Sequence, residues 1–139
     1  MNRSETRKVA FELIYSIEIQ KIDRSEYEEQ IHLFMENNNI HEKKVQEYIQ
    51  DVIYGIEDNK EAIIEQINKE LSEKWELNRL SKINIAILKL AIYEILYKKL
   101  PYKVVINEAV ELAKSYGDEN APSFINGILA SIVKNNHIE

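Results

Sequence analysis

Residues 80–97 read LSKINIAILKLAIYEILY, and this stretch decides the fold class. Its apolar residues fall on almost every side of a helix, and a helix with no wide polar face is usually central in its domain. Asn84, Lys89 and Glu94 interrupt the run, so it does not reach the roughly 18 apolar residues that a membrane-spanning helix needs. The stretch therefore predicts a central helix from about Leu80 to Tyr97 in a protein that does not span a membrane.

Two amphipathic segments follow this central helix, one between Pro101 and Gly117 and one that starts near Asn120. Their apolar residues recur at helical spacing. The first carries Val104, Val105, Ala109, Leu112 and Ala113, and the second carries Phe124, Ile125, Ile128, Leu129 and Ile132. Gly117 is expected to take the left-handed conformation beyond the first helix. Asn120 is expected to cap the second helix, with Pro122 tolerated in its first turn.

The N-terminal part of the chain carries four more helical repeats of apolar residues. They predict helices from about Arg3 to Lys21, after Asp23, from about His41 to Glu57, and after Asp58. Three pairs of residues are expected to form reciprocal caps, in which an Asn or Asp side chain accepts a backbone N–H and a Glu reaches back. These pairs are Asn2 with Glu5, Asp23 with Glu26, and Asp58 with Glu61.

The chain is predicted to be all-α, with about seven helices. Only 3 glycines and 2 prolines interrupt its 139 residues, and no run alternates apolar and polar residues as a strand would. The stretch from Trp75 to Asn78 looks like a connection between two halves. We therefore expect one domain with two packed helical subdomains, an N-terminal one of residues 1–74 and a C-terminal one of residues 75–139.

The charge and the cysteine content exclude several classes of site. The net charge is −6, so nucleic-acid binding has to rest on a local basic patch rather than on the whole surface. The chain has no cysteine, which excludes disulfides, thiolate metal sites and cysteine nucleophiles. No apolar export segment follows the N-terminal charges, so a cytoplasmic protein is expected.

No constellation of residues points to catalysis. The three glycines are scattered and cannot build a phosphate-binding loop. His32, His41 and His137 lie among polar residues, without a second ligand at metal spacing, and are expected at the surface. The carboxylates stand beside Lys and Arg on polar helix faces, as solvated ion pairs do. We therefore predict no catalytic site, no metal site and no cofactor.

Polar or small residues interrupt two apolar helix faces, and two interpretations stay open for them. These residues are Asn107, Glu108, Asn126 and Gly127. In the structural interpretation, Gly127 allows close helix packing and Asn126 satisfies a buried backbone group. In the functional interpretation, Asn126 presents a binding surface beside Phe124.

Four segments resemble the NusB family of bacterial transcription antitermination factors. Residues 7–15 read RKVAFELIY, residues 88–95 read LKLAIYEI, residues 101–117 read PYKVVINEAVELAKSYG, and residues 124–129 read FINGIL. Residues 23–73 match in helix layout alone. The resemblance implies two packed helical subdomains that divide near Trp75. It also implies pairing with NusE, a small-subunit ribosomal protein, and binding of single-stranded boxA RNA, which helps RNA polymerase pass terminators during ribosomal RNA synthesis.

The resemblance also implies the residues of the binding surfaces. Cations hold RNA phosphates, and aromatic rings stack on unpaired bases. The residues expected to contact RNA are Arg3, Arg7, Lys8, Tyr15, Lys89, Asn120 and Phe124. Those expected to contact NusE are Tyr15, Glu76 and Asn84. Arg7 and Lys8 are expected at polar helix positions, whereas Phe124 has a competing role in the core.

The chain departs from the family at its N-terminus. Family members often carry a run of arginines ahead of Arg7, where residues 3–6 read RSET. Each lost phosphate contact lowers the salt dependence of RNA binding by about one unit. We therefore expect weak RNA binding by the protein alone, with NusE supplying much of the affinity.

Two other functions are alternatives to antitermination. NusB-like domains also precede RNA cytosine methyltransferase domains, but that chemistry needs a cofactor loop and a cysteine, and this chain has no cysteine. A self-associating, protein-binding helical scaffold without RNA binding stays open, because a homodimer that covers the first helix would mask the RNA surface.

Overall fold

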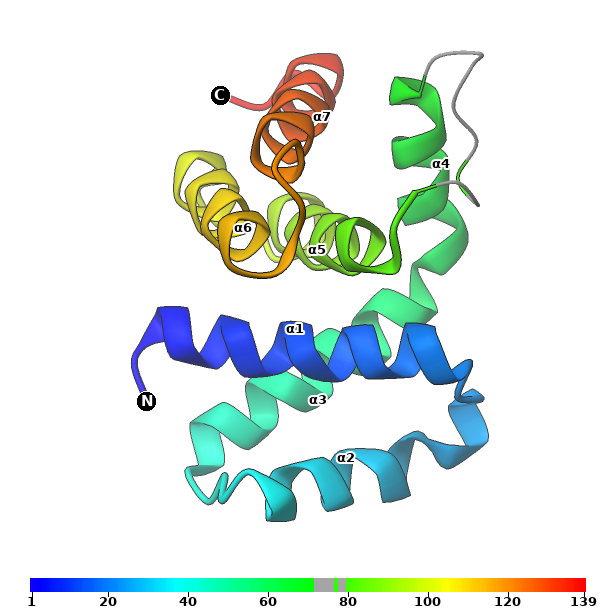
Figure 1. The fold of residues 1–139 in the computed structure, drawn as a ribbon, viewed down its shortest axis with the longest axis vertical. Coiled ribbons are helices and arrows are strands. Elements are labelled where there is room, and N and C mark those ends of the chain that lie inside the picture. Colours follow the sequence, from blue (N-terminus) through cyan, green and yellow to red (C-terminus); the bar gives the residue numbers. More distant parts are fainter. Residues whose placement is uncertain (72–76, 78–79) are drawn as a thin grey trace. The chain divides into compact units, whose positions relative to one another are not determined.

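The computed structural model describes residues 1–71, Leu77 and residues 80–139 (Figure 1). Within these ranges it contains seven α-helices and no β-strand, which confirms the all-α fold class. The helices are α1 (Arg3–Gln20), α2 (Tyr27–Asn37), α3 (Lys43–Asp58), α4 (Lys60–Glu70), α5 (Lys82–Ile92), α6 (Tyr102–Tyr116) and α7 (Ala121–Asn135). A 3₁₀ turn, η1 (Arg24–Glu26), precedes α2, and a π-helical turn, η3 (Tyr93–Tyr97), extends α5. In the described ranges, every helix is too short or too polar to cross a membrane.

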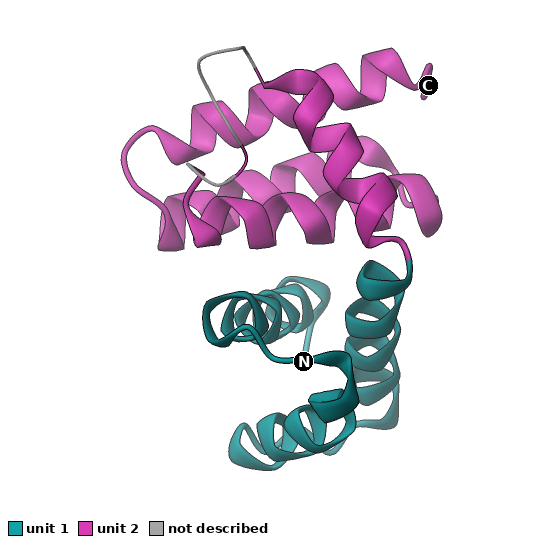
Figure 2. Ribbon diagram, turned by 90° about the vertical axis from the view of Figure 1, so that its right-hand side faces the viewer, with its two compact units in different colours: residues 1–58 teal, residues 59–139 magenta. Residues whose placement is uncertain are grey.

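The chain divides into two compact units, Met1–Asp58 and Asn59–Glu139 (Figure 2). The division falls earlier than the boundary expected near Trp75, which lies outside the described residues. Helix α4 belongs to the second unit because it packs against α5 and α7. Its Ile63 and Ile67 side chains are fully buried and face that packing.

Helix α5 is central in the second unit, as residues 80–97 predict. It contacts α4, α6 and α7, and every residue from Ile85 to Ile92 is buried. The α-helical hydrogen bonding ends at Ile92, and the π-helical turn carries the chain on to Tyr97. A helix with neighbours on several sides buries its whole circumference, which explains why its sequence lacks a polar face.

The helices beside α5 bury narrower stripes than the sequence predicts. Val105, Ala109, Leu112 and Ala113 of α6 are buried, whereas Val104 is 45% exposed. In α7, Phe124 is only partly buried, unlike the four apolar residues that follow it in the stripe. Apolar spacing alone therefore predicted two buried side chains, of which the packing leaves Val104 exposed and covers Phe124 only in part.

Gly117 is needed for space and not for a left-handed backbone. Its φ of −90° and ψ of 178° are extended, so the expected left-handed conformation is wrong. A Cβ at this position would lie 2.5 Å from the Cβ of Ala121 and 2.9 Å from the carbonyl oxygen of Ala113. Glycine therefore lets the end of α6 approach the start of α7.

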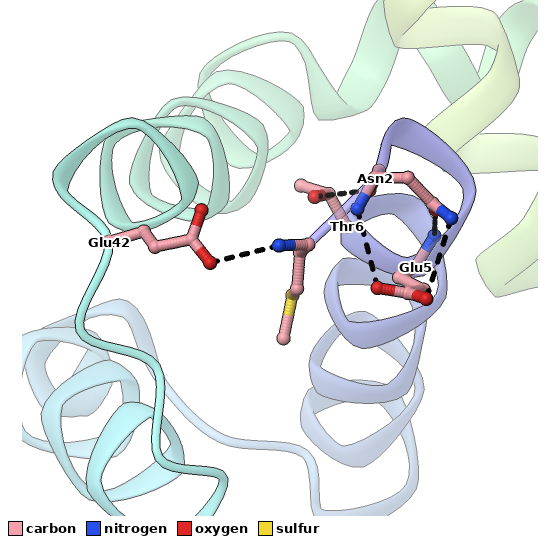
Figure 3. Close-up of polar contacts among 5 residues, drawn as sticks. Asn2, Glu5, Thr6 and Glu42 are labelled. Carbon is pink, nitrogen blue, oxygen red and sulfur yellow. Dashed lines mark hydrogen bonds and ion pairs between the residues drawn. The ribbon is translucent and has the colours of Figure 1, made fainter.

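The three expected caps differ in outcome. Asn2 and Glu5 form the reciprocal cap of α1: the Glu5 N–H donates to Asn2 Oδ1 at 2.8 Å, and the Asn2 N–H donates to Glu5 Oε2 at 3.3 Å (Figure 3). Asp23 instead accepts from the N–H and hydroxyl of Ser25, because a 3₁₀ turn precedes α2. Asp58 ends α3 and forms an ion pair with Arg24 at 2.6 Å, so the expected cap of α4 is wrong.

A cluster of aromatic and charged side chains joins the start of α2 to the end of α3 in the first unit. The Tyr27 hydroxyl donates to Glu57 Oε2 at 3.2 Å, and the Tyr27 ring meets the edge of the Tyr54 ring. The Arg24 guanidinium lies 5.2 Å from the Tyr54 ring centroid. Burial, followed by the negative charge of Glu57, raises the pKa of Tyr27 to about 12. The cluster therefore favours the protonated phenol.

We predict that Gly117→Ala lowers the free energy of unfolding by about 1–3 kcal/mol, the usual cost of overpacking. Gly127→Ala is the control. Gly127 lies inside α7 with no atom within 4 Å of an added Cβ, so this variant should be more stable by about 1 kcal/mol. Urea unfolding followed by circular dichroism measures both. Equal effects of the two variants would contradict the close approach at Gly117.

We predict that the stability contributed by Tyr27 depends on pH above about 10. A tyrosine in the unfolded chain has its ordinary pKa of about 10. Because folding raises the pKa of Tyr27 to about 12, its contribution is complete below pH 10 and is lost as the pH rises through 12. The difference in unfolding free energy between the protein and Tyr27→Phe should therefore shrink between about pH 9 and pH 12. The exposed Tyr97, replaced by Phe, is the control, and a constant difference for Tyr27→Phe would refute the prediction.

Candidate nucleic-acid interface

The first two turns of α1 present exposed charges of both signs. Arg3 and Lys8 are exposed, as predicted, and so is Glu5. The terminal ammonium of Met1 lies 2.9 Å from Glu42 Oε1, whose hydrogen bond and charge raise the pKa of that ammonium (Figure 3). The Glu5 N–H already donates to Asn2, so this part of the helix terminus is not open to an anion. Anion binding at the start of α1 therefore depends on the side chains of Arg3 and Lys8.

Arg7 differs from its neighbour Lys8 in access to solvent. Arg7 is only 6% exposed, so its expected place on a polar helix face is wrong. A buried guanidinium is seldom free, because an unpaired buried charge is costly. The role of Arg7 as an RNA contact stays a prediction, and the burial gives the residue a structural role in any case.

Tyr15 lies further along α1 and is half-buried. Its ring stacks on the buried ring of Phe11, with centroids 6.2 Å apart and planes inclined by 20°. A core ring therefore fixes the orientation of Tyr15 while part of its surface stays open to a ligand.

In the second unit, a pocket of about 470 Å³ lies where α5 and α7 begin. Its lining residues are Leu80, Ser81, Asn84, Asp118, Asn120, Ala121 and Phe124. The pocket brings together three predicted residues: Asn84, assigned to NusE, and Asn120 and Phe124, assigned to RNA. Leu80 and Ala121 are buried and give the pocket apolar walls.

Local hydrogen bonds shape this pocket. The Ser81 hydroxyl caps α5 by accepting from the Asn84 N–H at 3.0 Å. Asp118 Oδ1 accepts from the Asn120 N–H at 2.9 Å. Asn120 itself has helical dihedral angles and its side chain forms no capping bond, so the expected cap of α7 is wrong. The exposed amide of Asn120 is therefore not used by the end of its own helix.

Asn84 has an unusual environment for a pocket residue. Its side-chain oxygen is buried and accepts no hydrogen bond from the part of the chain that the structure describes. An unsatisfied buried acceptor costs about 1–3 kcal/mol. A donor from a bound molecule would recover part of that cost.

The remaining predicted residues lie elsewhere. Lys89 is 7% exposed in the middle of α5 and does not line the pocket. Glu76 lies outside the described residues. His32, His41 and His137 are exposed, and no metal-binding group of three His, Asp or Glu side chains occurs among the described residues.

Sequence reasoning missed Ser81 and Asp118 as pocket residues. Ser81 precedes the first helical residue by one position, as an N-cap does, and Asp118 lies two residues before Asn120, as in a turn in which a side chain accepts a nearby N–H. These signals predict local caps and turns. They do not predict that the two helix starts lie side by side.

The sequence and the fold find counterparts in known proteins. The model of the NusB family matches residues 4–134. The transcription antitermination protein NusB of Acetivibrio thermocellus is 48% identical over 135 residues, which cover 96% of this chain and 90% of that protein.

Solved structures agree with this assignment. T. maritima NusB superposes with a TM-score of 0.84 at 36% identity and covers 96% of this chain and 92% of its own. A crystal structure of the antitermination factors NusB and NusE in complex with dsRNA superposes with a TM-score of 0.83 at 28% identity, over 97% of this chain and 99% of its own. The chain belongs to the NusB family.

Proposed function

We propose that this member of the NusB family promotes transcription antitermination by binding boxA RNA as a single strand, in a heterodimer with NusE. The bound RNA and NusE join the RNA polymerase antitermination complex in the bacterial cytoplasm, where transcription of ribosomal RNA operons takes place. Binding alone performs this function, and no covalent step is required of the protein.

The pocket at the start of α5 and α7 is the observation that carries the proposal. Phe124 is only partly buried there, although an apolar ring at a helical core position is ordinarily covered. An accessible ring is a platform on which an unpaired base stacks, whatever its sequence. The exposed amide of Asn120 beside it supplies a donor and an acceptor that recognise a base edge.

The charges near the start of α1 support a phosphate contact of limited strength. Arg3 and Lys8 are exposed cations, whereas Glu5 places a negative charge between them in the sequence. The net charge of −6 adds a general repulsion of phosphate. Two exposed cations give a weak salt-dependent attraction, which favours a partner that shares the RNA.

The structural neighbours support NusE as that partner. One chain of the crystal structure of NusB and NusE with RNA superposes on this protein over 97% of its length. That complex holds double-stranded RNA, so a binding experiment has to compare a single strand with a duplex of the same sequence. We propose Tyr15, Asn84 and Glu76 as the contacts to NusE. Tyr15 and Asn84 are partly exposed, whereas Glu76 is proposed from the sequence alone.

We predict that replacing Arg3 and Lys8 together by Ala weakens binding of a boxA-like RNA and reduces its salt dependence. Two lost phosphate contacts to a single strand should lower the slope of log K against log salt by about 1.4. Fluorescence anisotropy at two salt concentrations, with and without NusE, measures the slope.

The control for Arg3 and Lys8 removes two charges elsewhere. Lys60 and Lys134 are exposed on α4 and α7, and their double Ala variant has the same net charge. An equal loss in both variants would mean that total charge, and not the start of α1, attracts the RNA. No binding by the unaltered protein with NusE would reject the proposed function, and sedimentation would then show whether a homodimer covers α1.

We predict that Phe124→Ala lowers the affinity for RNA by about 1–3 kcal/mol, the contribution of one stacked base. Because the ring is only partly buried, the variant should lose less stability than the 3–5 kcal/mol of a buried phenylalanine. Phe124→Tyr is the control that keeps the ring and should keep the affinity. Normal affinity together with a large loss of stability in Phe124→Ala would assign the ring to the core.

A further inference from the structure

A second basic surface lies where η3 ends and α6 begins. Residues 95–107 contain Lys98, Lys99 and Lys103 and no Asp or Glu, in a chain whose net charge is −6. None of these lysines belongs to the interface predicted from the family resemblance. The segment is therefore an unassigned positive region on an otherwise acidic protein.

The backbone of this segment is fixed by hydrogen bonds to buried residues. The Lys98 N–H donates to the carbonyl of Tyr93 at 3.2 Å, and the Leu100 N–H donates to the carbonyl of Glu94 at 3.1 Å. Tyr93 and Glu94 are both buried. The Val104 N–H donates to the carbonyl of Pro101 and so closes the first turn of α6. The lysines therefore project from a defined turn, which lowers the entropy lost on binding a ligand.

Two of the lysines are available to an external anion. Lys99 and Lys103 are exposed, and neither forms an ion pair with any residue in the described ranges. Lys114, further along the same helix as Lys103, instead lies 3.2 Å from the carboxylate of Glu111. Unpaired cations on one turn attract phosphates more strongly than lysines that a neighbouring carboxylate neutralises.

An aromatic ring accompanies these cations. Tyr97 is 39% exposed, and its ring stacks on the buried Tyr93 ring with centroids 5.9 Å apart. Val104 beside Lys103 is also exposed. Exposed cations two and six residues after a supported, accessible ring suit a single-stranded nucleic acid, because lysines hold its phosphates while a base stacks on the ring. An acidic protein surface would use the lysines but would have no need for the ring.

We propose that Lys99, Lys103 and Tyr97 form a second contact for single-stranded RNA, which holds nucleotides that flank the boxA segment. We name this set of three residues the flanking-RNA surface. The inference rests on the proposed function, because boxA is the segment bound at the pocket.

The flanking-RNA surface is separate from that pocket. Asn84 lies in the first turn of α5, and Tyr97 ends the π-helical turn that continues the same helix. At 1.5 Å per residue, these two positions are about 20 Å apart along the helix. With one phosphate per 3.4 Å of a stacked strand, about six nucleotides span that distance. A strand held at the pocket therefore needs about six further nucleotides to reach the flanking-RNA surface.

RNA strands of different length test the inference. The affinity of a boxA core is compared with that of strands extended by about three, six and nine nucleotides at either end, with NusE present. We expect the extension that reaches Tyr97 to tighten binding about tenfold, the order expected for one stacked base. The double variant Lys99→Ala/Lys103→Ala should lose that gain and bind the core normally, and Tyr97→Leu should lose most of it.

A matched variant controls for charge. Lys114→Ala/Lys134→Ala removes two exposed lysines from the same unit and should keep the gain. Extended strands that bind no tighter than the core, or a gain that survives in Lys99→Ala/Lys103→Ala, would overturn the inference and leave the proposed function standing. Extended strands bound through Lys99 and Lys103 without any binding of the core would reject the proposed function and keep the flanking-RNA surface. Loss of the gain in both double variants but not in Tyr97→Leu would identify a general charge effect and overturn the inference.

Discussion

The burial of α5 on all sides is the constraint on which the second unit depends. Eight consecutive residues, Ile85 to Ile92, are buried, and the helix contacts α4, α6 and α7. Neither end of α5 is covered in this way, because Ser81 is exposed before it and Tyr97 is exposed after it. The core thus fixes two distant positions that stay open to ligands. One is the pocket beside Phe124, and the other is the turn that carries Lys99 and Lys103.

Because the protein is acidic overall, the pocket and the lysine-bearing turn are stronger indications of RNA contacts than they would be on a basic protein. Nonspecific attraction of RNA needs many phosphate contacts, and a net charge of −6 works against it. In the proposed function, recognition then depends on stacking and on base-edge hydrogen bonds, which are short-ranged and need a defined geometry. Both rings proposed as stacking platforms have supports of their own: Phe124 belongs to the first turn of α7, and Tyr97 rests on Tyr93. In that proposal, the protein contributes the geometry of the contacts and the partner contributes charge.

Most of the fold could be predicted from the sequence, because helical periodicity of apolar residues reports burial directly. The same rule failed where burial and residue type disagree. Arg7 and Lys89 are charged yet buried, and Val104 is apolar yet exposed. Long side chains bury their carbon stems wherever the tertiary packing covers them, and no local spacing indicates that. The sequence predicted that Gly117 matters, but for the wrong reason. Ala113 and Ala121 lie so close that no side chain fits at position 117, and the backbone φ angle does not require glycine.

The sequence names three residues that line the pocket, but it does not predict that they lie together. Asn84, Asn120 and Phe124 were expected to serve two different ligands, yet they line one pocket. Only the packing of α5 against α7 brings them together. Among the described residues, no donor reaches the buried side-chain oxygen of Asn84, and an unmet buried acceptor lowers stability. Local features that oppose stability are expected at functional sites, where binding supplies the missing partner. In the proposed function, the donor that Asn84 lacks among the described residues comes from the amino group of a base or from a backbone N–H of NusE. That proposal places a contact to the RNA and a contact to NusE at one pocket.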